Sequence, residues 1–243
     1  MSRAATRQRQ IRMYLAGGAV TACGLTAGLV AAPAMAAGSA APAMAPGSAA
    51  TVNVVHGIPG IAVKVCVDGK AVADHVRYGN TIVGAKLTAT THRVRLVAAG
   101  KPCTAAAVLK SAYTLDRGRN YTIVANLNRG GRPNLKAFVN NVTPTAAGHA
   151  RLTVRHTAQA PAVNVWAGPT KLIGGTSFKW GKTATVAVPA ATYSAKVTLP
   201  GSRKAVIGPV SATLRQGRAY QLFAVGSPGH YRLVTVKIGV GTR

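Results

Sequence analysis

Three side chains that could do chemistry lie within thirteen residues of one another in VVHGIPGIAVKVCVDGK, residues 54–70. His56, Cys66 and Asp68 are of the types that ligate zinc or copper and that build nucleophilic sites. The same stretch of residues is equally typical of a strand, a Pro-containing turn and a second strand that ends in a tight Asp-Gly turn. The two interpretations predict different roles for the same residues.

An echo of this stretch, about one hundred residues later, favours the structural interpretation. VRHTAQAPAVNVWAGPT, residues 154–170, keeps a histidine, His156, and the alternating valines but has neither the cysteine nor the aspartate. Three later segments correspond in the same order: VRYGNT with FKWGKT, YTLDRGRNYTIVA with ATLRQGRAYQLFA, and LKAFV with LVTVKI. Internal repeats of this kind indicate repeated structural units. We expect tandem domains at 51–143 and 150–243, with a linker at 144–149.

The two histidines share strand parity with apolar neighbours. Val54 and His56 face the same way, as do Val154 and His156, which predicts a histidine at the apolar margin of each sheet. We expect their ring nitrogens to bond nearby backbone. Zinc or copper ligation is the alternative, but no Cys or Asp stands beside His156. The sequence therefore predicts no metal site and no cofactor.

Short Val-, Ile- and Thr-rich runs separated by Gly, Pro, Asn and Asp turns indicate an all-β fold. No window of eleven or more residues after the leader has a helical period. We expect two tandem immunoglobulin-like antiparallel β-sandwich domains. In HRVRLV, residues 92–97, Val94 and Leu96 face the core while Arg93 and Arg95 face outward. Many basic residues should therefore line the outer faces of strands.

The first 36 residues have the pattern of a secretory signal peptide. Four arginines precede the uncharged run MYLAGGAVTACGLTAGLVAA, and Ala34-Met35-Ala36 supplies a small-residue cleavage site. Residues 37–50 would then form a flexible Ala/Pro/Ser/Gly tether. Two alternatives stay open: a lipidated Cys23, and a leader retained as a membrane anchor. We expect a secreted or envelope-associated protein in any of these cases.

Export to an oxidising space favours a disulfide between the two remaining cysteines, Cys66 and Cys103. Val65 and Val67 share the core face, so Cys66 should point outward with Lys64. Cys103 lies in AGKPCTA, a loop pattern. We expect a surface staple from strand to loop, with two free thiols or a redox pair as the alternatives.

Charge is the extreme feature of the composition. There are 30 Lys and Arg residues against three acids, a net charge of +27. Without the four leader arginines, 26 basic residues remain, thirteen in each expected domain, and the net charge is +23. Such a surface attracts polyanions. The acids are Asp68, Asp74 and Asp116, and there is no glutamate. A paired-carboxylate mechanism would therefore need two of these three aspartates to lie together.

Other catalytic and recognition patterns are also missing. There is no Gly-x-Ser-x-Gly elbow, and the second domain has no acid to orient a histidine. NRGGRPN, residues 128–134, lacks the Gly-Lys-Ser/Thr ending of a P-loop and is interpreted as a basic hairpin loop. No nucleic-acid reading motif is present, and few aromatics stand among the basic residues. We expect no enzymatic activity and no specific nucleic-acid readout.

The stretches VNVVHGIPGIAVKVCVDGKAV, VRYGNTIVGAKLTATTHRVRL and LDRGRNYTIVA resemble the bacterial domain of unknown function 4397, whose members open with V-V-H-x-x-P-x-x-x-x-V-D-V-Y-V-D-G. The resemblance covers most of residues 52–140 and, more weakly, 151–238. It implies tandem copies of a secreted or envelope-associated immunoglobulin-like sandwich with no established activity. Lys64 and Asn164 stand where the family has an acid, and Cys66 and Trp166 where it has an aromatic.

Together these features predict an exported, non-enzymatic, envelope-associated protein that binds anionic polymers or surfaces through distributed Lys and Arg. The expected partners are anionic cell-wall polymers, polysaccharides or membrane surfaces. The alternative is an adhesion or protein–protein interaction module that uses sheet edges and loops, in which the charge gives solubility and steering.

Overall fold

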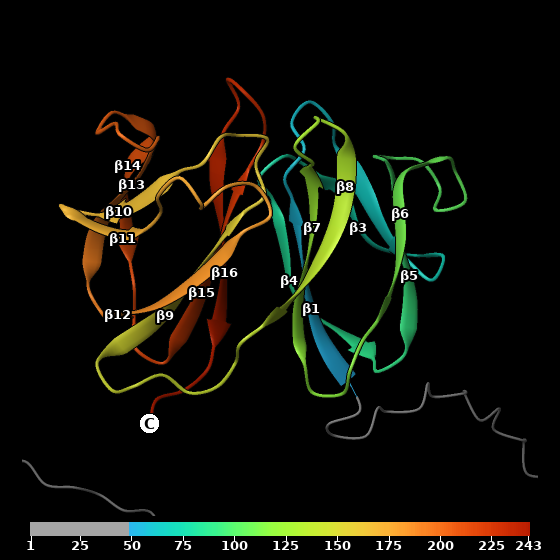
Figure 1. Cartoon of the computed structure of the whole chain (residues 1–243). Coiled ribbons are helices and arrows are strands. Elements are labelled where there is room, and N and C mark those ends of the chain that lie inside the picture. Colours follow the sequence, from blue (N-terminus) through green and yellow to red (C-terminus); the bar gives the residue numbers. More distant parts are fainter. Residues whose placement is uncertain (1–48) are drawn as a thin grey trace, which may run out of the picture. The chain divides into compact units, whose positions relative to one another are not determined.

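A computed structural model describes residues 49–243 of the chain. The predicted signal peptide at 1–36, Cys23 and nearly all of the predicted tether lie outside the described residues. Within them the fold is all-β, with sixteen strands in four sheets and no helix (Figure 1). Residues 49–243 accordingly contain no helix that could span a membrane. The predicted fold class is confirmed.

The first eight strands form a first sandwich of two four-stranded sheets, ordered β4-β1-β7-β8 and β3-β2-β5-β6. Alternating Val, Ile and Thr suit these half-buried pleated surfaces. The strands are β1 (Ala49–His56), β2 (Val63–Val67), β3 (Lys70–Val76), β4 (Thr81–Thr88), β5 (Thr91–Ala98), β6 (Ala107–Thr114), β7 (Asn120–Leu127) and β8 (Pro133–Asn140).

The last eight strands repeat this arrangement in a second sandwich, with sheets ordered β12-β9-β15-β16 and β11-β10-β13-β14. Strand orders match one to one, so β9 corresponds to β1 and β16 to β8. The strands are β9 (His149–His156), β10 (Asn164–Ala167), β11 (Thr170–Ile173), β12 (Thr183–Pro189), β13 (Thr192–Thr198), β14 (Ala205–Thr213), β15 (Arg218–Val225) and β16 (Arg232–Gly239).

One pairing in each sandwich departs from the purely antiparallel arrangement expected. β1 runs parallel to β7, and β9 runs parallel to β15. Between β1 and β7 the chain crosses to the opposite sheet and back twice, first for β2 and β3 and then for β5 and β6, and β9 and β15 are connected in the same way. Every other named pairing is antiparallel.

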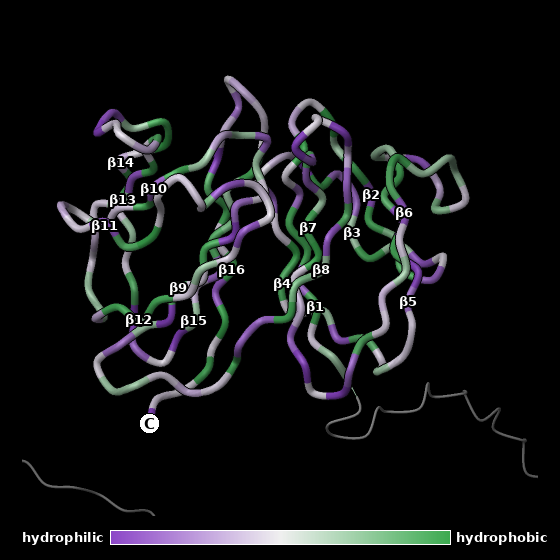
Figure 2. Tube along the Cα trace, viewed as in Figure 1, coloured by the Kyte–Doolittle hydropathy of each residue, from purple (hydrophilic) through white to green (hydrophobic). Residues whose placement is uncertain are grey.

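Local sequence signals explain the turns and the cores. Asp68 and Gly69 connect β2 to β3 with φ of 51° and 80°, the two positive values that a tight hairpin turn needs. Val94 and Leu96 are buried while Arg93 is exposed, as strand parity predicts. Figure 2 shows hydrophobic residues concentrated along the strands and hydrophilic residues at many of the connecting loops.

A tyrosine fixes the turn before the central strand of each sandwich. The Tyr121 hydroxyl accepts a hydrogen bond from the Asp116 amide at 3.0 Å, and the Tyr220 hydroxyl accepts one from the Arg215 amide at 2.9 Å. In each case the bond reaches back five residues. This geometry is typical of the tyrosine corner found in immunoglobulin-like sandwiches.

Strands β1, β7, β9 and β15 bury nearly all their side chains, on both faces. One face packs into the core of its own sandwich and the other against the other sandwich. Val55 and Val124 of the first sandwich form one buried cluster with Phe223, Val234 and Val236 of the second. The sheets β4-β1-β7-β8 and β12-β9-β15-β16 are therefore inner sheets, and their central strands are covered on both faces.

Arg155 lies inside this interface, although basic residues were expected on outer faces. Its side chain is 4% exposed, and its guanidinium lies 4.8 Å from the ring centre of Phe138 and 5.3 Å from that of Phe223. It donates hydrogen bonds to the Gln221 side chain and, at 3.0 Å, to the Val139 carbonyl. Burial lowers the pKa of Arg155 to about 10. The outer face of β9 is thus an interface rather than a solvated surface.

The two sandwiches contact each other reciprocally. The Tyr78 hydroxyl of the first sandwich contacts the carbonyls of His230 and, at 3.4 Å, of Val225, the last residue of β15. Trp180 of the second sandwich donates from Nε1 to the carbonyl of Leu127, the last residue of β7, at 3.0 Å. Tyr78 and Trp180 occupy matching places in VRYGNT and FKWGKT. The repeat in sequence is therefore also a repeat of the contacts across the interface.

Two strands begin slightly earlier than the expected domain edges, and the segment between the sandwiches is anchored. β1 starts at Ala49, inside the predicted tether, and Ala50 is fully buried. In the predicted linker 144–149, Thr145 is 5% exposed and forms an isolated parallel bridge with Thr242 near the C-terminus. The connection is held against the second sandwich by backbone hydrogen bonds.

Candidate anion-binding surface

His56 and His156 are buried at the sheet margins and bonded to backbone, as the sequence predicted. Nε2 of His56 lies 2.9 Å from the Ile61 carbonyl, and Nε2 of His156 lies 2.7 Å from the Pro161 carbonyl. Burial lowers the pKa of both imidazoles. A neutral ring must donate from Nε2 to reach a carbonyl, so each histidine fixes the turn that follows its strand.

His56, Cys66 and Asp68 are each committed to a different partner. His56 bonds the Ile61 carbonyl, Cys66 is tied to Cys103, and Asp68 contacts His92 and the Arg93 amide. In residues 49–243, no three His, Cys, Asp or Glu side chains converge on a common point that could hold a metal ion. The opening stretch is a strand, a turn and a second strand.

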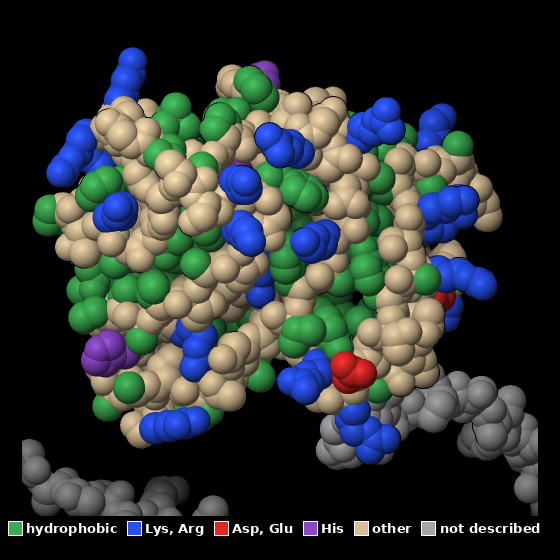
Figure 3. Space-filling view, viewed as in Figure 1, with side chains coloured by type: hydrophobic (Ala, Val, Ile, Leu, Met, Phe, Trp, Pro, Cys, Tyr) green, Lys and Arg blue, Asp and Glu red, His purple; other side chains and the backbone are tan. Residues whose placement is uncertain are grey.

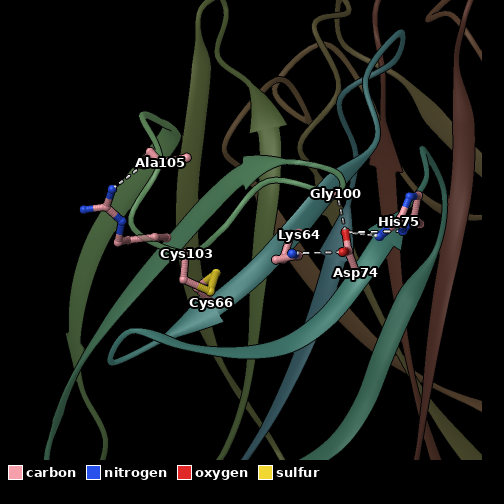
Figure 4. Close-up of a disulfide and its surroundings, with 8 residues drawn as sticks. Lys64, Cys66, Asp74, His75, Gly100, Cys103 and Ala105 are labelled. Atoms are coloured by element: carbon pink, nitrogen blue, oxygen red, sulfur yellow. Dashed lines mark hydrogen bonds and ion pairs between the residues drawn. A yellow bond between two sulfur atoms is a disulfide. The ribbon is translucent and has the colours of Figure 1, made fainter.

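Cys66 and Cys103 have the geometry of a disulfide, with their Sγ atoms 2.00 Å apart and their Cα atoms 5.9 Å apart (Figure 4). Cys66 shares the side of β2 that carries Lys64, away from the core, but it is fully buried. The predicted bridge from strand to loop is present, but its predicted position at the surface is wrong for Cys66. The loop 99–106 folds over this side of β2 and covers it, which strand parity alone cannot reveal.

Polar contacts also pin the loop 99–106. Arg95 donates to the Ala105 carbonyl at 2.7 Å, and Asp74 accepts from the Gly100 amide at 3.1 Å (Figure 4). Asp74 also pairs with the Lys64 ammonium at 3.0 Å. Partial removal of water raises the pKa of Asp74, but the bonds from Gly100, Lys64 and the His75 amide outweigh it and lower that pKa to about 2.

We expect Asp74→Asn to flatten the acid dependence of stability. A carboxyl whose pKa is lowered by folding stabilises the protein above its unfolded pKa, 3.8 for aspartate, and this contribution is lost as the pH falls toward 2. Asparagine keeps an acceptor for the Gly100 amide but does not titrate. The measurement is the urea midpoint of both proteins across this pH range. Parallel pH profiles would contradict the prediction; the Asp68 pKa, which is also lowered, affects both proteins alike.

The pair Asp68–His92 is a feature that sequence reasoning missed. Asp68 Oδ2 lies 2.6 Å from His92 Nδ1, and His92 Nε2 lies 2.9 Å from the Thr88 carbonyl. At the matching register of the second sandwich, Tyr193 donates to the Pro189 carbonyl at 2.8 Å. Both side chains hold the same hairpin, so the arrangement is structural.

Trp166 forms the centre of a basic cluster on the outer sheet of the second sandwich. Its ring centre lies 5.7 Å from the Lys196 ammonium and 5.1 Å from the Arg203 guanidinium, and Lys171 pairs with it across β10 and β11. Its register matches that of Cys66 in the first sandwich. The Trp–cation cluster thus stands where the first sandwich has its disulfide and covering loop. The sequence indicates this cluster of unpaired cations because no acidic residue occurs after Asp116.

Nearly all the other cations also lack an acidic neighbour. In the part of the chain that the structure describes, Lys64 is the one Lys or Arg whose side-chain nitrogen lies within 4 Å of a carboxylate. Figure 3 shows Lys and Arg side chains spread across the visible face, with few acidic side chains between them. The loop at 128–134 is a basic hairpin loop as predicted, closed by bonds from the Gly130 and Arg132 amides to Asn128.

Residues 50–166 match a family model, Domain of unknown function (DUF4397). The match supports the DUF4397 assignment made from the sequence. It covers all of the first sandwich except Ala49 and continues through β9 to Trp166 in β10. No curated protein matches the chain.

Proposed function

We propose that this protein is exported, has no enzymatic activity, and binds anionic polymers of the cell envelope through its distributed Lys and Arg side chains. The observation that carries the proposal is the unbalanced charge of the folded part, 26 basic residues against three acids. A cation without a carboxylate partner contributes its full field to the surrounding solvent. Each sandwich carries thirteen of these basic residues, so no single patch accounts for the charge.

We propose further that the chain consists of tandem copies of an immunoglobulin-like DUF4397 sandwich. The matched strand orders, the matched registers of β5–β6 and β13–β14, and a tyrosine corner in each half support this. The disulfide is consistent with a location outside the cytoplasm, because disulfides persist in oxidising compartments.

Salt dependence tests the electrostatic proposal. The protein is expected to bind purified cell wall at low ionic strength and to be released at about 0.5 M salt, because the screening length falls from about 10 Å at 0.1 M to about 3 Å at 1 M. Wall stripped of its anionic polymers is the matched control and should retain much less protein. Retention that persists above about 0.5 M salt, or equal retention on stripped wall, would overturn the proposal.

Two charge-matched variants test whether the binding is distributed. One replaces three cations around Trp166 with glutamine, and the other replaces three exposed cations of the first sandwich in the same way. The sets are Lys171, Lys196 and Arg203 against Lys70, Lys110 and Arg117. Distributed binding predicts that both variants lose wall affinity by a similar factor. A loss confined to the Trp166 set would instead locate binding at that cluster.

The second candidate is an adhesion or protein–protein interaction module. The exposed edge strands and their apolar side chains favour it, among them Val206 at 40% exposure and Val210 at 48% in β14. This module would bind its partner with little dependence on salt, so the salt titration separates the two candidates.

A further inference from the structure

A cavity of about 340 Å³ lies inside the second sandwich, between its two sheets. Its wall is mostly apolar, with Leu152, Val165, Leu222 and Leu233 contributing from both sheets. It extends to the edge strands β14 and β16, which both contribute lining residues. Small-molecule sites in proteins have volumes of roughly 300–1,000 Å³ and are lined mainly by apolar side chains. This cavity falls within that range.

The first sandwich shows what fills the same space there. Ala212 pairs with Tyr193 on β13, and at the matching register Tyr113 pairs with His92 on β5. Tyr113 is partly buried and packs on the core of the first sandwich with Leu135 and Ala137. A phenol ring thus occupies the position where the second sandwich has only a methyl group. In addition, β6 packs along β8, a contact that β14 and β16 do not make to the same extent.

The same comparison places a cation beside the cavity. Lys237 pairs with Tyr220 on β15, and the matching residue in the first sandwich is Val139, paired with Tyr121. Lys237 lines the cavity and is exposed, so its ammonium reaches solvent at the opening. No acid occurs after Asp116, and Lys237 has no carboxylate within 4 Å in the described structure. The cavity therefore combines an apolar interior with one uncompensated positive charge.

We propose that this cavity binds a single-chain amphiphile, an alkyl chain with one carboxylate, with the chain between the sheets and the carboxylate at Lys237. Two differences from the first sandwich favour the site: Ala212 stands in place of Tyr113, and Lys237 in place of Val139. Tyr193, which stands in place of His92, also lines the cavity. Burial of an alkyl chain supplies the affinity, and the ammonium selects an anionic head group. This inference does not rest on the proposed wall binding.

Binding of decanoate to the full-length protein tests this inference. We expect saturable binding of one decanoate per chain at submicellar concentration, measured by calorimetry. Decan-1-ol, which has the same chain without the charge, should bind about tenfold more weakly, as expected for one lost charge-assisted hydrogen bond. No saturable binding, or equal binding of the acid and the alcohol, would overturn the proposal.

Variants copied from the first sandwich locate the site. Ala212→Tyr should fill the cavity and reduce decanoate affinity by at least about tenfold, while Lys237→Val should reduce the preference for decanoate over decanol. Lys110→Val removes the same charge from an exposed position in β6 and should change neither. If Ala212→Tyr lowers the melting temperature, Ala212→Leu repeats the test with a smaller side chain. Decanoate binding that is unaffected in folded Ala212 variants would contradict the assignment, as would equal effects of the two lysine changes.

Discussion

Replacing Phe223 with alanine is expected to lower the free energy of unfolding by about 3–5 kcal/mol. Phe223 is fully buried in the cluster that joins the two sandwiches, which also contains Val55 and Val124 of the inner sheet opposite. Its ring also covers one side of the Arg155 guanidinium. The substitution would leave a cavity and remove that cover, so a buried charge would lose part of its favourable surroundings.

The measurement is equilibrium unfolding in urea, followed by fluorescence and by circular dichroism. Since the interface buries apolar side chains of both sandwiches, the wild-type protein should unfold in one transition, and the variant should show the two sandwiches separating. Val83→Ala, at a site that is 55% exposed, is the matched control and should change stability by less than about 0.5 kcal/mol. A wild-type protein that already unfolds in two separate steps would contradict the role given to this interface.

Removing the disulfide is expected to cost about 3–4 kcal/mol, because the bridge closes a long loop in the unfolded chain. Cys66 and Cys103 are 37 positions apart in sequence. The variant with both cysteines replaced by alanine avoids free thiols, and its unfolding free energy is compared with that of the wild type. The Arg95–Ala105 and Asp74–Gly100 contacts remain, so the native loop should keep its position.

Reducing agent provides the internal control for this second experiment. It should bring the wild-type protein to the stability of the double variant and leave the double variant itself unchanged. The second sandwich has no cysteine, so any effect of reduction originates in the first sandwich. A loss of less than about 1 kcal/mol, well below the loop-entropy expectation, would show that the remaining contacts of the loop 99–106 already hold it in place.

Local patterns in the sequence were sufficient for the strands and turns. Asp68-Gly69 predicts a hairpin because few other dipeptides accept two positive φ values, and both are present. The parity of Val94 and Leu96 against Arg93 predicts the buried face of β5 because a strand repeats every two residues. The histidine–backbone bonds followed from the placement of His56 and His156 at strand ends.

The contacts between distant segments could not be obtained in the same way. Cys66 has the expected parity but is buried, because a loop more than thirty residues away in sequence covers it. Arg155 has the parity of an outer face, yet that face meets the first sandwich. One signal for this interface was present: TIVA in β7 and QLFAV in β15 are runs without regular alternation, as strands buried on both faces tend to be.

The reciprocal contacts of Tyr78 and Trp180 give this chain the architecture of a homodimer made from one polypeptide. In a true two-fold homodimer each residue change appears in both subunits, because one gene encodes them. Here the halves share the pairing surface but are encoded separately. Cys66 against Trp166, and Tyr113 against Ala212, are changes that occur in one half alone. One half can therefore stay a closed sandwich with a disulfide, while the sequence of the other half changes and opens a cavity between its own sheets.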